Sequence, residues 1–119
     1  MKRGFVLLLI NIVALVGQPA SASSEGCYAR CVTQAQKAQA RHAINFVFGG
    51  HAAAALRVAR CESGLSVNAF NGQYKGLFQM GRGERARYGH GPTPWEQAIA
   101  AYRYYRASGS DWSPWSCKP

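Results

Sequence analysis

The chain has 119 residues, of which 14 are Lys or Arg and only five are Asp or Glu, so its formal net charge is +9. This length excludes an arrangement of several domains and allows one small domain. The positive charge predicts attraction to an anionic partner, but it does not choose among nucleic acid, acidic lipid and the anionic polymers of a cell wall.

The first 22 residues have the pattern of a secretory signal peptide. Lys2 and Arg3 form a short basic start, residues 5–16 are almost entirely apolar, and residues 20–22 read Ala-Ser-Ala. A membrane anchor is the alternative, but this apolar run is shorter than the roughly 20 residues that span a bilayer. Cleavage after residue 22 would leave 97 of the 119 residues, lower the charge from +9 to +7, and predict a secreted protein.

Four cysteines follow the predicted signal peptide, and export makes them candidates for disulfides. Three pairings are possible, and spacing alone does not choose among them. Cys27 and Cys31 are four residues apart, so a helix would place them on one face, where a bridge is possible but tight. A metal site made by these two with His42 is disfavoured, because the spacing matches no zinc pattern and the compartment is oxidising. We expect no metal and no other cofactor.

Two helices are expected in the first half of the mature chain. Residues 26–48 are rich in Ala and Gln and nearly free of Gly and Pro, which predicts one helix that ends at residues 49–50, a Gly-Gly pair. A second helix is expected from residue 51 to 62, with Gly64 as its stop. Apolar side chains recur at i and i+4 along this second helix, and Glu62 takes the next position on the same stripe.

The chain between residues 66 and 91 is interrupted by glycines. A short helix is expected around residues 83–88, with at most an irregular hairpin near residues 73–78. The tail from residue 110 is expected to be a loop. These patterns predict a mainly α-helical fold in one small domain.

A clearer helix start lies at Thr93, Pro94 and Glu96, which form a capping box with proline at the first helical position. Apolar and aromatic residues at helical spacing continue this helix to Gly109. The aromatic residues that the spacing places in the core are Trp95, Tyr102 and Tyr105.

The five acidic residues differ in how well a structural role explains them. Four have such a role: Glu25 at the terminus, Glu84 among three arginines on a solvated face, Glu96 in the capping box and Asp111 as a turn former. Glu62 has no such explanation. The structural alternative for Glu62 is a buried carboxylate that backbone donors satisfy.

The predicted setting of Glu62 suits a general acid. A position on an apolar face removes water and raises the pKa of the carboxyl group, and the carbonyl groups at a helix C-terminus act in the same direction. A carboxylic acid that stays protonated near neutral pH can donate a proton to a leaving oxygen, as in glycoside cleavage. We therefore expect Glu62 to lie in a dry cleft as a proton donor.

Three stretches carry a family resemblance, and in chain order they read ARCESG, NGQYKGLFQM and DWSPWSC. This set resembles the lysozyme-like superfamily, and it is most similar to small actinobacterial transglycosylase-like proteins, the catalytic domain of resuscitation-promoting factors and soluble lytic transglycosylases. The resemblance covers residues 56–117 and implies a lysozyme-like domain over residues 51–119, with residues 23–50 as a helical segment of open role. The chain differs from resuscitation-promoting factors in reading GLFQM where they read GGLQF.

The resemblance also implies roles for individual residues. Glu62 corresponds to the catalytic acid, and Gln79 lines the cleft beside it. Asn71 and Tyr74 fall in the loop that contacts the sugars. The aromatic candidates for stacking on a sugar ring are Tyr74, Tyr88 and Trp112.

A disulfide between Cys61 and Cys117 is implied by the same resemblance. It would lock the tail against the catalytic helix, for which a stabilisation of a few kcal/mol is typical. Cys27 and Cys31 would then be the remaining pair, and they lie outside the region of resemblance.

The implied reaction is cleavage of the MurNAc–GlcNAc β-1,4 bond of peptidoglycan. An ordinary glycosidase needs a second carboxylate about 5–9.5 Å from the acid, and the next acid after Glu62 is Glu84, within an arginine cluster. One-acid chemistry is therefore favoured, in which the N-acetyl group of the sugar stabilises the positive centre. Glu62 would then act as base on the sugar's own hydroxyl, giving a 1,6-anhydro end, or on water, giving a hydrolysed end. Asp111 is the remaining candidate for a second acid.

Two other readings stay open. A cationic peptidoglycan-binding or signalling protein without useful catalysis would share the fold and the charge. A secreted membrane-disrupting protein would share the charge and the aromatic residues, but no exposed basic amphipathic helix stands out apart from the segment 26–48. We expect a monomer associated with peptidoglycan and anionic cell-wall polymers, without stable membrane insertion after signal cleavage; nucleic-acid binding has only the charge in its favour.

Overall fold

Helices dominate the fold, as the sequence predicts. The structure is a computed structural model that describes residues 32–119. The elements in chain order are α1 (Gln34–Phe48), the 3-10 turn η1 (Gly49–His51), α2 (Ala52–Ser63), β1 (Phe70–Asn71), β2 (Tyr74–Lys75), α3 (Arg82–Tyr88) and α4 (Pro94–Ala107). The expected mainly α-helical single domain is confirmed, whereas the predicted signal peptide and the Cys27–Cys31 pair lie outside the described residues.

Helix α1 begins later than the composition predicts. Its N-cap is Thr33, whose hydroxyl accepts from the Gln36 amide at 3.1 Å while the Gln36 side chain accepts from the Thr33 amide at 2.8 Å. This capping box satisfies two free donors at the helix start, so the helix starts at Gln34 rather than at residue 26. Its end at Phe48 agrees with the prediction, because Gly49 has a φ of 53° that favours glycine.

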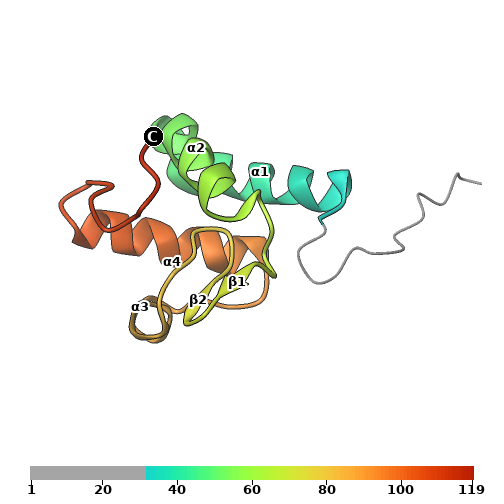
Figure 1. Cartoon of the computed structure of the whole chain (residues 1–119). Helices are drawn as coiled ribbons and strands as arrows, with labels where there is room; N and C mark the ends of the chain where they lie inside the picture. The colour runs from blue at the N-terminus through green and yellow to red at the C-terminus, as the bar shows by residue number, and fades with distance from the viewer. Residues whose placement is uncertain (1–31) are drawn as a thin grey trace, which may run out of the picture.

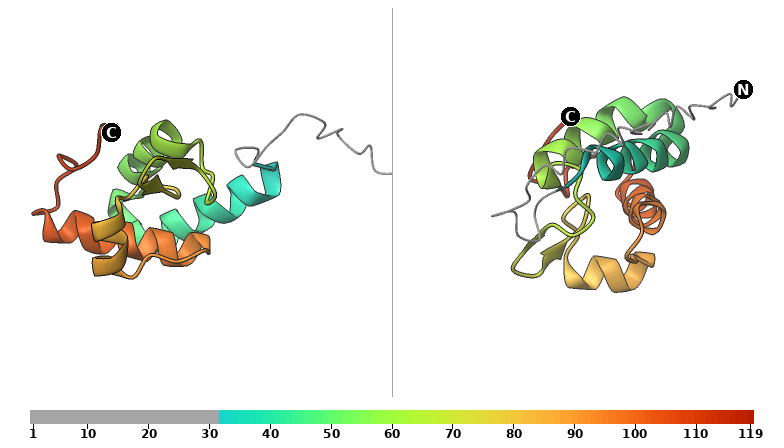
Figure 2. Two further views of the ribbon diagram at one scale, coloured as in Figure 1. Left: turned by 60° about the horizontal axis from the view of Figure 1, so that its bottom comes forward. Right: turned by 90° about the vertical axis from the view of Figure 1, so that its right-hand side faces the viewer.

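The helices pack around α1, which contacts both α2 and α4, and α3 packs on α4 (Figures 1 and 2). In the view of Figure 1 the β1–β2 hairpin and α3 are drawn below α4, and the C-terminal tail runs from the end of α4 back to α2. None of the helices within residues 32–119 is long and apolar enough to cross a membrane. The packing of the helices, the hairpin and the tail brings the end of α2, the hairpin, α3 and the tail close together.

The core is built on stacked aromatic rings. The Phe48 ring stacks on Phe78 with 5.5 Å between centroids and on Trp112 with 5.8 Å, and Tyr105 lies 4.6 Å from Trp112. All four side chains are buried. These contacts join the end of α1, the loop before α3, the end of α4 and the tail.

The core face of α4 differs from the predicted one. Ala98, Ala101 and Tyr105 are buried at i, i+3 and i+7, but Trp95 is 38% exposed and forms T-shaped pairs with His42 and Phe46. The placement of Trp95 in the core is therefore wrong. It lies in the first turn of α4, on the flank of the stripe that α1 covers, so its ring reaches only the rim of the core.

The hairpin lies slightly earlier in the chain than expected. Phe70 pairs with Lys75 and Asn71 pairs with Tyr74, with Gly72 in the turn at a φ of 59°. A further bridge joins Lys75 to Met80 and so folds the following loop back on the hairpin.

Gln97 holds this loop to α4 from inside the core. The side chain is buried, accepts from the Leu77 amide at 2.8 Å, and donates to the carbonyls of Val67 at 3.1 Å and Gly91 at 3.0 Å. A Cβ on Gly76 would lie 2.5 Å from the Gln97 carbonyl oxygen, so the loop passes against this side chain. One buried amide thus fixes the loop that leads to Gln79.

Gln97→Leu is expected to lower the free energy of unfolding by about 1–3 kcal/mol for each buried group that loses its partner. The Leu77 amide is the main such group, because its bond to Gln97 is fully buried. Denaturant unfolding of the variant and of Arg106→Gln, on the exposed side of the same helix, measures the difference. Equal midpoints for the two variants would show that the Gln97 bonds contribute no stability.

His90 is expected to make the stability of the fold depend on pH. Its Nε2 atom is buried without a hydrogen-bond partner among the described residues. Burial first, and then the positive charge of Arg85, lower the pKa of His90, although Glu96 acts in the opposite direction. The unfolded chain therefore takes up the proton more readily, and the stability that His90 contributes is present above its ordinary pKa of 6.5.

Stability is expected to fall as the pH drops below about 6.5 and through the lowered pKa of folded His90. In His90→Gln this part of the pH dependence should disappear, because the variant side chain does not titrate. Thermal midpoints of both proteins between pH 5 and 8 test the effect. Parallel curves for the two proteins would assign the slope to other groups.

Candidate active site

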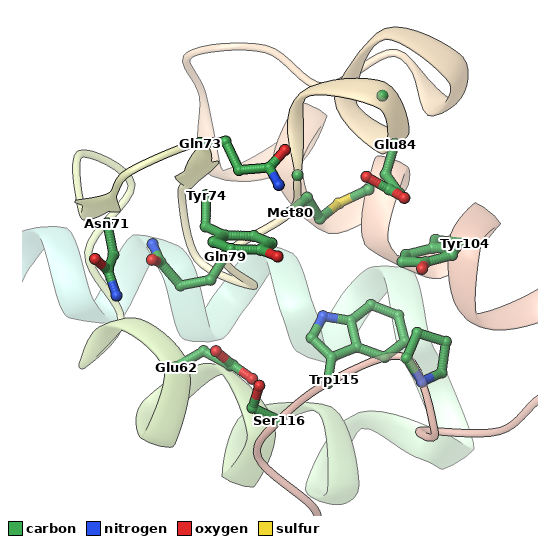
Figure 3. A pocket seen from close by; sticks show the side chains of 13 residues that line it. Glu62, Asn71, Gln73, Tyr74, Gln79, Met80, Glu84, Tyr104, Trp115 and Ser116 are labelled. Carbon is green, nitrogen blue, oxygen red and sulfur yellow. The ribbon is translucent and has the colours of Figure 1, made fainter.

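A cleft of about 500 Å³ lies between the end of α2, the hairpin, α3 and the tail (Figure 3). It is lined by Glu62, Asn71, Gln73, Tyr74, Gln79, Met80, Gly81, Gly83, Glu84, Tyr104, Pro114, Trp115 and Ser116. A second hollow of about 370 Å³ shares Glu62, Asn71 and Gln79 with it and continues past Ala69 and Phe70. The two hollows meet at these three residues, so an extended ligand could pass Glu62 from one hollow to the other.

Glu62 stands in the last turn of α2 and projects toward the cleft (Figure 3). It is half-buried, which is wetter than the dry setting that the apolar stripe predicts. Its Oε1 atom accepts from the Cys117 amide at 2.9 Å, and within residues 32–119 this is the hydrogen bond that the carboxylate makes. One oxygen is thus engaged by the backbone, and the other remains available to a ligand.

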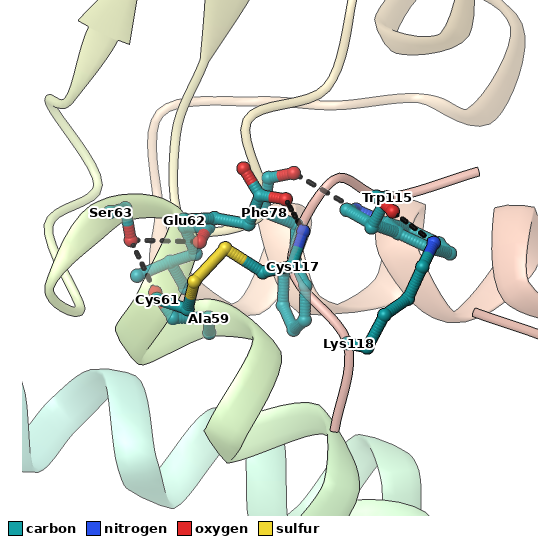
Figure 4. The surroundings of a disulfide bond; sticks show 9 residues. Ala59, Cys61, Glu62, Ser63, Phe78, Trp115, Cys117 and Lys118 are labelled. Atoms are coloured by element: carbon teal, nitrogen blue, oxygen red, sulfur yellow. Dashed lines mark hydrogen bonds between the residues drawn. A yellow bond between two sulfur atoms is a disulfide. The ribbon is translucent and has the colours of Figure 1, made fainter. Parts of the chain in front are cut away.

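The tail is fastened beside Glu62 by three kinds of contact (Figure 4). The Cys61–Cys117 disulfide joins residues 56 positions apart, as the resemblance implies. The Trp115 indole donates to the Phe78 carbonyl at 2.9 Å, and the Lys118 ammonium donates to the carbonyls of Trp112, Ser113 and Trp115. These contacts hold Trp115 and Ser116 as one wall of the cleft.

Gln79 lines the cleft at the position that the resemblance predicts, but its amide is engaged with the backbone. The side-chain nitrogen donates to the carbonyls of Ala69 and Gly76, each at 3.1 Å. Its backbone has a φ of 46°, an uncommon conformation for a residue with a side chain. Ser63 adds a second anchor, since its hydroxyl donates to the Leu77 carbonyl at 2.7 Å. The loop that carries Gln79 is therefore rigidly attached to α2 and the hairpin.

Asn71 and Tyr74 face each other across the hairpin and both line the cleft. Tyr74 is 46% exposed, so its ring offers an accessible surface at the rim. Accessible aromatic faces suit contact with the apolar face of a sugar. The structure thus brings Glu62, Gln79, Asn71 and Tyr74 together, and their contacts with sugars stay a prediction.

The two other aromatic candidates are not in the cleft. Trp112 is buried in the core against Phe48, and Tyr88 stacks on Tyr104 with 5.2 Å between centroids. The cleft is lined instead by Trp115 and Tyr104. The motif DWSPWSC contains two tryptophans three residues apart, and the sequence carries no signal for which one faces the cleft.

Glu84 also lines the cleft, contrary to its predicted role on a solvated face. It is half-buried in the first turn of α3, on the wall opposite Glu62 (Figure 3). Asp111, the other candidate for a second acid, is exposed and accepts from the Ser113 amide at 3.2 Å. Asp111 therefore forms a turn and lies outside the cleft.

The cleft offers no evident metal site. Among the described residues no group of three His, Cys, Asp or Glu side chains could hold a metal ion. Arg82 and Arg87 are exposed on α3, the helix that forms one wall of the cleft. The arrangement combines one accessible carboxylate at a helix end, a second on the opposite wall, amide side chains and aromatic rings.

The chain matches no model of a known protein family, no curated protein and no solved structure. The lysozyme-like resemblance therefore remains a prediction from three sequence stretches, and a proposal about function depends on the geometry of the cleft.

Proposed function

We propose that this protein cleaves the glycan strands of peptidoglycan at the MurNAc–GlcNAc β-1,4 bond, with Glu62 as general acid. The observation that carries the proposal is the position of Glu62 where two hollows meet, with one carboxylate oxygen bound to the Cys117 amide and the other available. A polymer that lies across both hollows would place an inter-sugar oxygen at this point. The volume of the main cleft lies in the range of ordinary ligand sites.

The chemistry requires a proton at the glycosidic oxygen as the bond to C1 breaks. Glu62 would supply this proton, and the N-acetyl group of the substrate would stabilise the positive centre at C1. Attack by the sugar's own hydroxyl then gives a 1,6-anhydro end, whereas attack by water gives a reducing end. Asn71, Tyr74 and Trp115 would hold the sugars on either side of the bond.

Positive charge supports binding to a wall. The net charge of +9, or +7 after the predicted cleavage, would attract anionic wall polymers. The exposed Arg82 and Arg87 lie on the same helix as the cleft residue Glu84, so this attraction would act near the site. We therefore propose a secreted, wall-associated enzyme that acts as a monomer.

One observation favours a second candidate, a binding or signalling protein of the same fold. Because Glu62 accepts a hydrogen bond from the Cys117 amide, its carboxylate also has a structural role in holding the tail. A protein that uses Glu62 only in this way would bind glycan strands in the cleft without breaking them.

Digestion of purified peptidoglycan separates the two candidates. The mature protein is incubated with sacculi, Glu62→Gln serves as the blank, and the soluble muropeptides are weighed by mass spectrometry. Fragments that only the wild-type protein releases support the enzyme, and their masses distinguish anhydro from reducing ends, which differ by one water. Wild-type protein that binds sacculi but releases no more than the blank would leave the binding candidate.

A further inference from the structure

We infer that Glu84 is a second catalytic carboxylate, which activates the water that attacks C1 on the side of the sugar opposite Glu62. This inference rests on the proposed function and assigns its chemistry. It adds to the one-acid reaction of the proposed function a hydrolytic route that uses a pair of carboxylates. The expected product is a reducing end with inverted anomeric configuration.

The first support is the placement of Glu84 in the same cleft as Glu62. Glu84 comes from α3 and Glu62 from α2, so the two stand on opposite walls, with the Trp115 side of the cleft between them (Figure 3). Inverting glycosidases also hold their two carboxylates on opposite sides of the scissile bond, because a water must fit between one of them and the sugar.

The second support is a space that the backbone leaves for the Glu84 carboxylate. A Cβ built on Gly81 would lie 2.6 Å from Glu84 Oε2 and 3.4 Å from Gln73 Oε1. Gly81 has a φ of −67°, which any residue can adopt, so the backbone conformation does not require glycine there. Glycine at this position lets the carboxylate lie against the chain at the cleft wall.

The third support is that the Arg85 side chain makes its hydrogen bonds to backbone carbonyls and not to the Glu84 carboxylate. The Arg85 guanidinium donates to the carbonyls of Gln73 and Met80, whereas Arg82 and Arg87 are exposed. The pKa of Tyr104, which lines the cleft, is raised first by burial and then by the negative charge of Glu84.

A purely structural role is the alternative. An acid in the first turn of a helix interacts favourably with the free amides there, for roughly 0.3–1 kcal/mol. That role would affect the stability of α3 and not the kind of product. The nature of the product therefore distinguishes the two roles.

The proposed step balances as a single displacement. The Glu62 proton moves to the glycosidic oxygen, which leaves with the electron pair of its bond to C1. Water forms the new bond to C1 and gives its proton to Glu84. Glu84 then releases this proton to solvent and Glu62 takes one up, so both carboxyl groups return to their starting states, with no oxidant or metal required.

Two variants test the inference by product and not only by rate. In Glu84→Gln the release of reducing ends is expected to fall by about 10²–10⁴-fold, the usual effect of a general base, while any Glu62-dependent anhydro ends persist. Gly81→Ala, which displaces the Glu84 carboxylate by one methyl group, should shift the product ratio in the same direction. Asp111→Asn removes an acid outside the cleft and should keep the wild-type ratio.

Azide provides a readout that a structural role would not move. In Glu84→Ala the space left by the carboxylate admits azide, which needs no base, and the expected product is a glycosyl azide of inverted configuration. Thermal midpoints show that each variant is folded under the assay conditions. An unchanged ratio of reducing to anhydro ends in folded Glu84→Gln, or only anhydro ends from the wild type, would overturn the role of Glu84 and leave Glu62-dependent cleavage intact. Absence of any Glu62-dependent product would overturn the proposed function itself, and this inference with it.

Discussion

Replacing Glu62 with Gln is expected to lower the rate of glycan-strand cleavage by about 10²–10⁴-fold, the range for loss of a positioned general acid. The amide of Gln cannot protonate the leaving oxygen. Its carbonyl oxygen can still accept the hydrogen bond from the Cys117 amide that Glu62 Oε1 accepts at 2.9 Å. The tail should therefore keep its place. Initial rates of muropeptide release at equal protein concentration measure the effect, with binding to sacculi expected to persist.

Two further variants separate chemistry from structure at this position. Glu62→Ala removes the proton donor and also leaves the Cys117 amide without its acceptor, so it should be as inactive as Glu62→Gln but less stable, by about 1.5–3 kcal/mol for a hydrogen bond to a charged group. Asp111→Asn loses one negative charge outside the cleft and should cleave at the wild-type rate. If Glu62→Gln retained activity within a few-fold of wild type, Glu62 would be an anchor for the tail and not the acid.

Local signals in the sequence predict most of the helical framework. The capping box of Thr93 and Glu96 predicts the start of α4, and Gly64, whose backbone is left-handed, predicts the end of α2. Both signals depend on only a few neighbouring residues. Helix α1 starts eight residues after the expected position, because the Ala- and Gln-rich composition does not reveal the capping box between Thr33 and Gln36. A composition argument gives the existence of a helix more reliably than its first residue.

The candidate site could be predicted only in part, for a related reason. Glu62, Gln79, Asn71 and Tyr74 lie in two short stretches whose pattern carries the resemblance, and the structure brings them together. Trp115 and Glu84 reach the cleft through tertiary packing, which depends on how the tail and α3 fold back. Arginine neighbours in the sequence suggest that Glu84 has ion-pair partners, but the Arg85 side chain turns to backbone carbonyls instead. Sequence proximity is a poor guide to which charges meet.

Removing the Cys61–Cys117 disulfide is expected to have the largest effect on stability. The bridge closes a loop with a sequence separation of 56, and restriction of the unfolded chain by a loop of this size contributes about 4 kcal/mol in the chain-entropy account. A double variant, Cys61→Ser with Cys117→Ser, should therefore unfold at clearly lower denaturant. Chemical unfolding of the oxidised wild type and of the double variant measures this difference.

Activity should respond to the same change for a reason beyond stability. The bridge holds the residue whose amide binds Glu62, and it lies next to Trp115 and Ser116 on the cleft wall. At a temperature where the double variant remains folded, muropeptide release should still fall, because the Glu62 carboxylate loses its fixed orientation. Lys118→Ala is the matched control, since it removes the contacts to three tail carbonyls while the disulfide remains. This variant should lose less stability and less activity than the double variant. A folded double variant with wild-type activity would mean that the hydrogen bonds of Trp115, Cys117 and Lys118 hold the tail in place without the bridge, and that the disulfide only stabilises the fold.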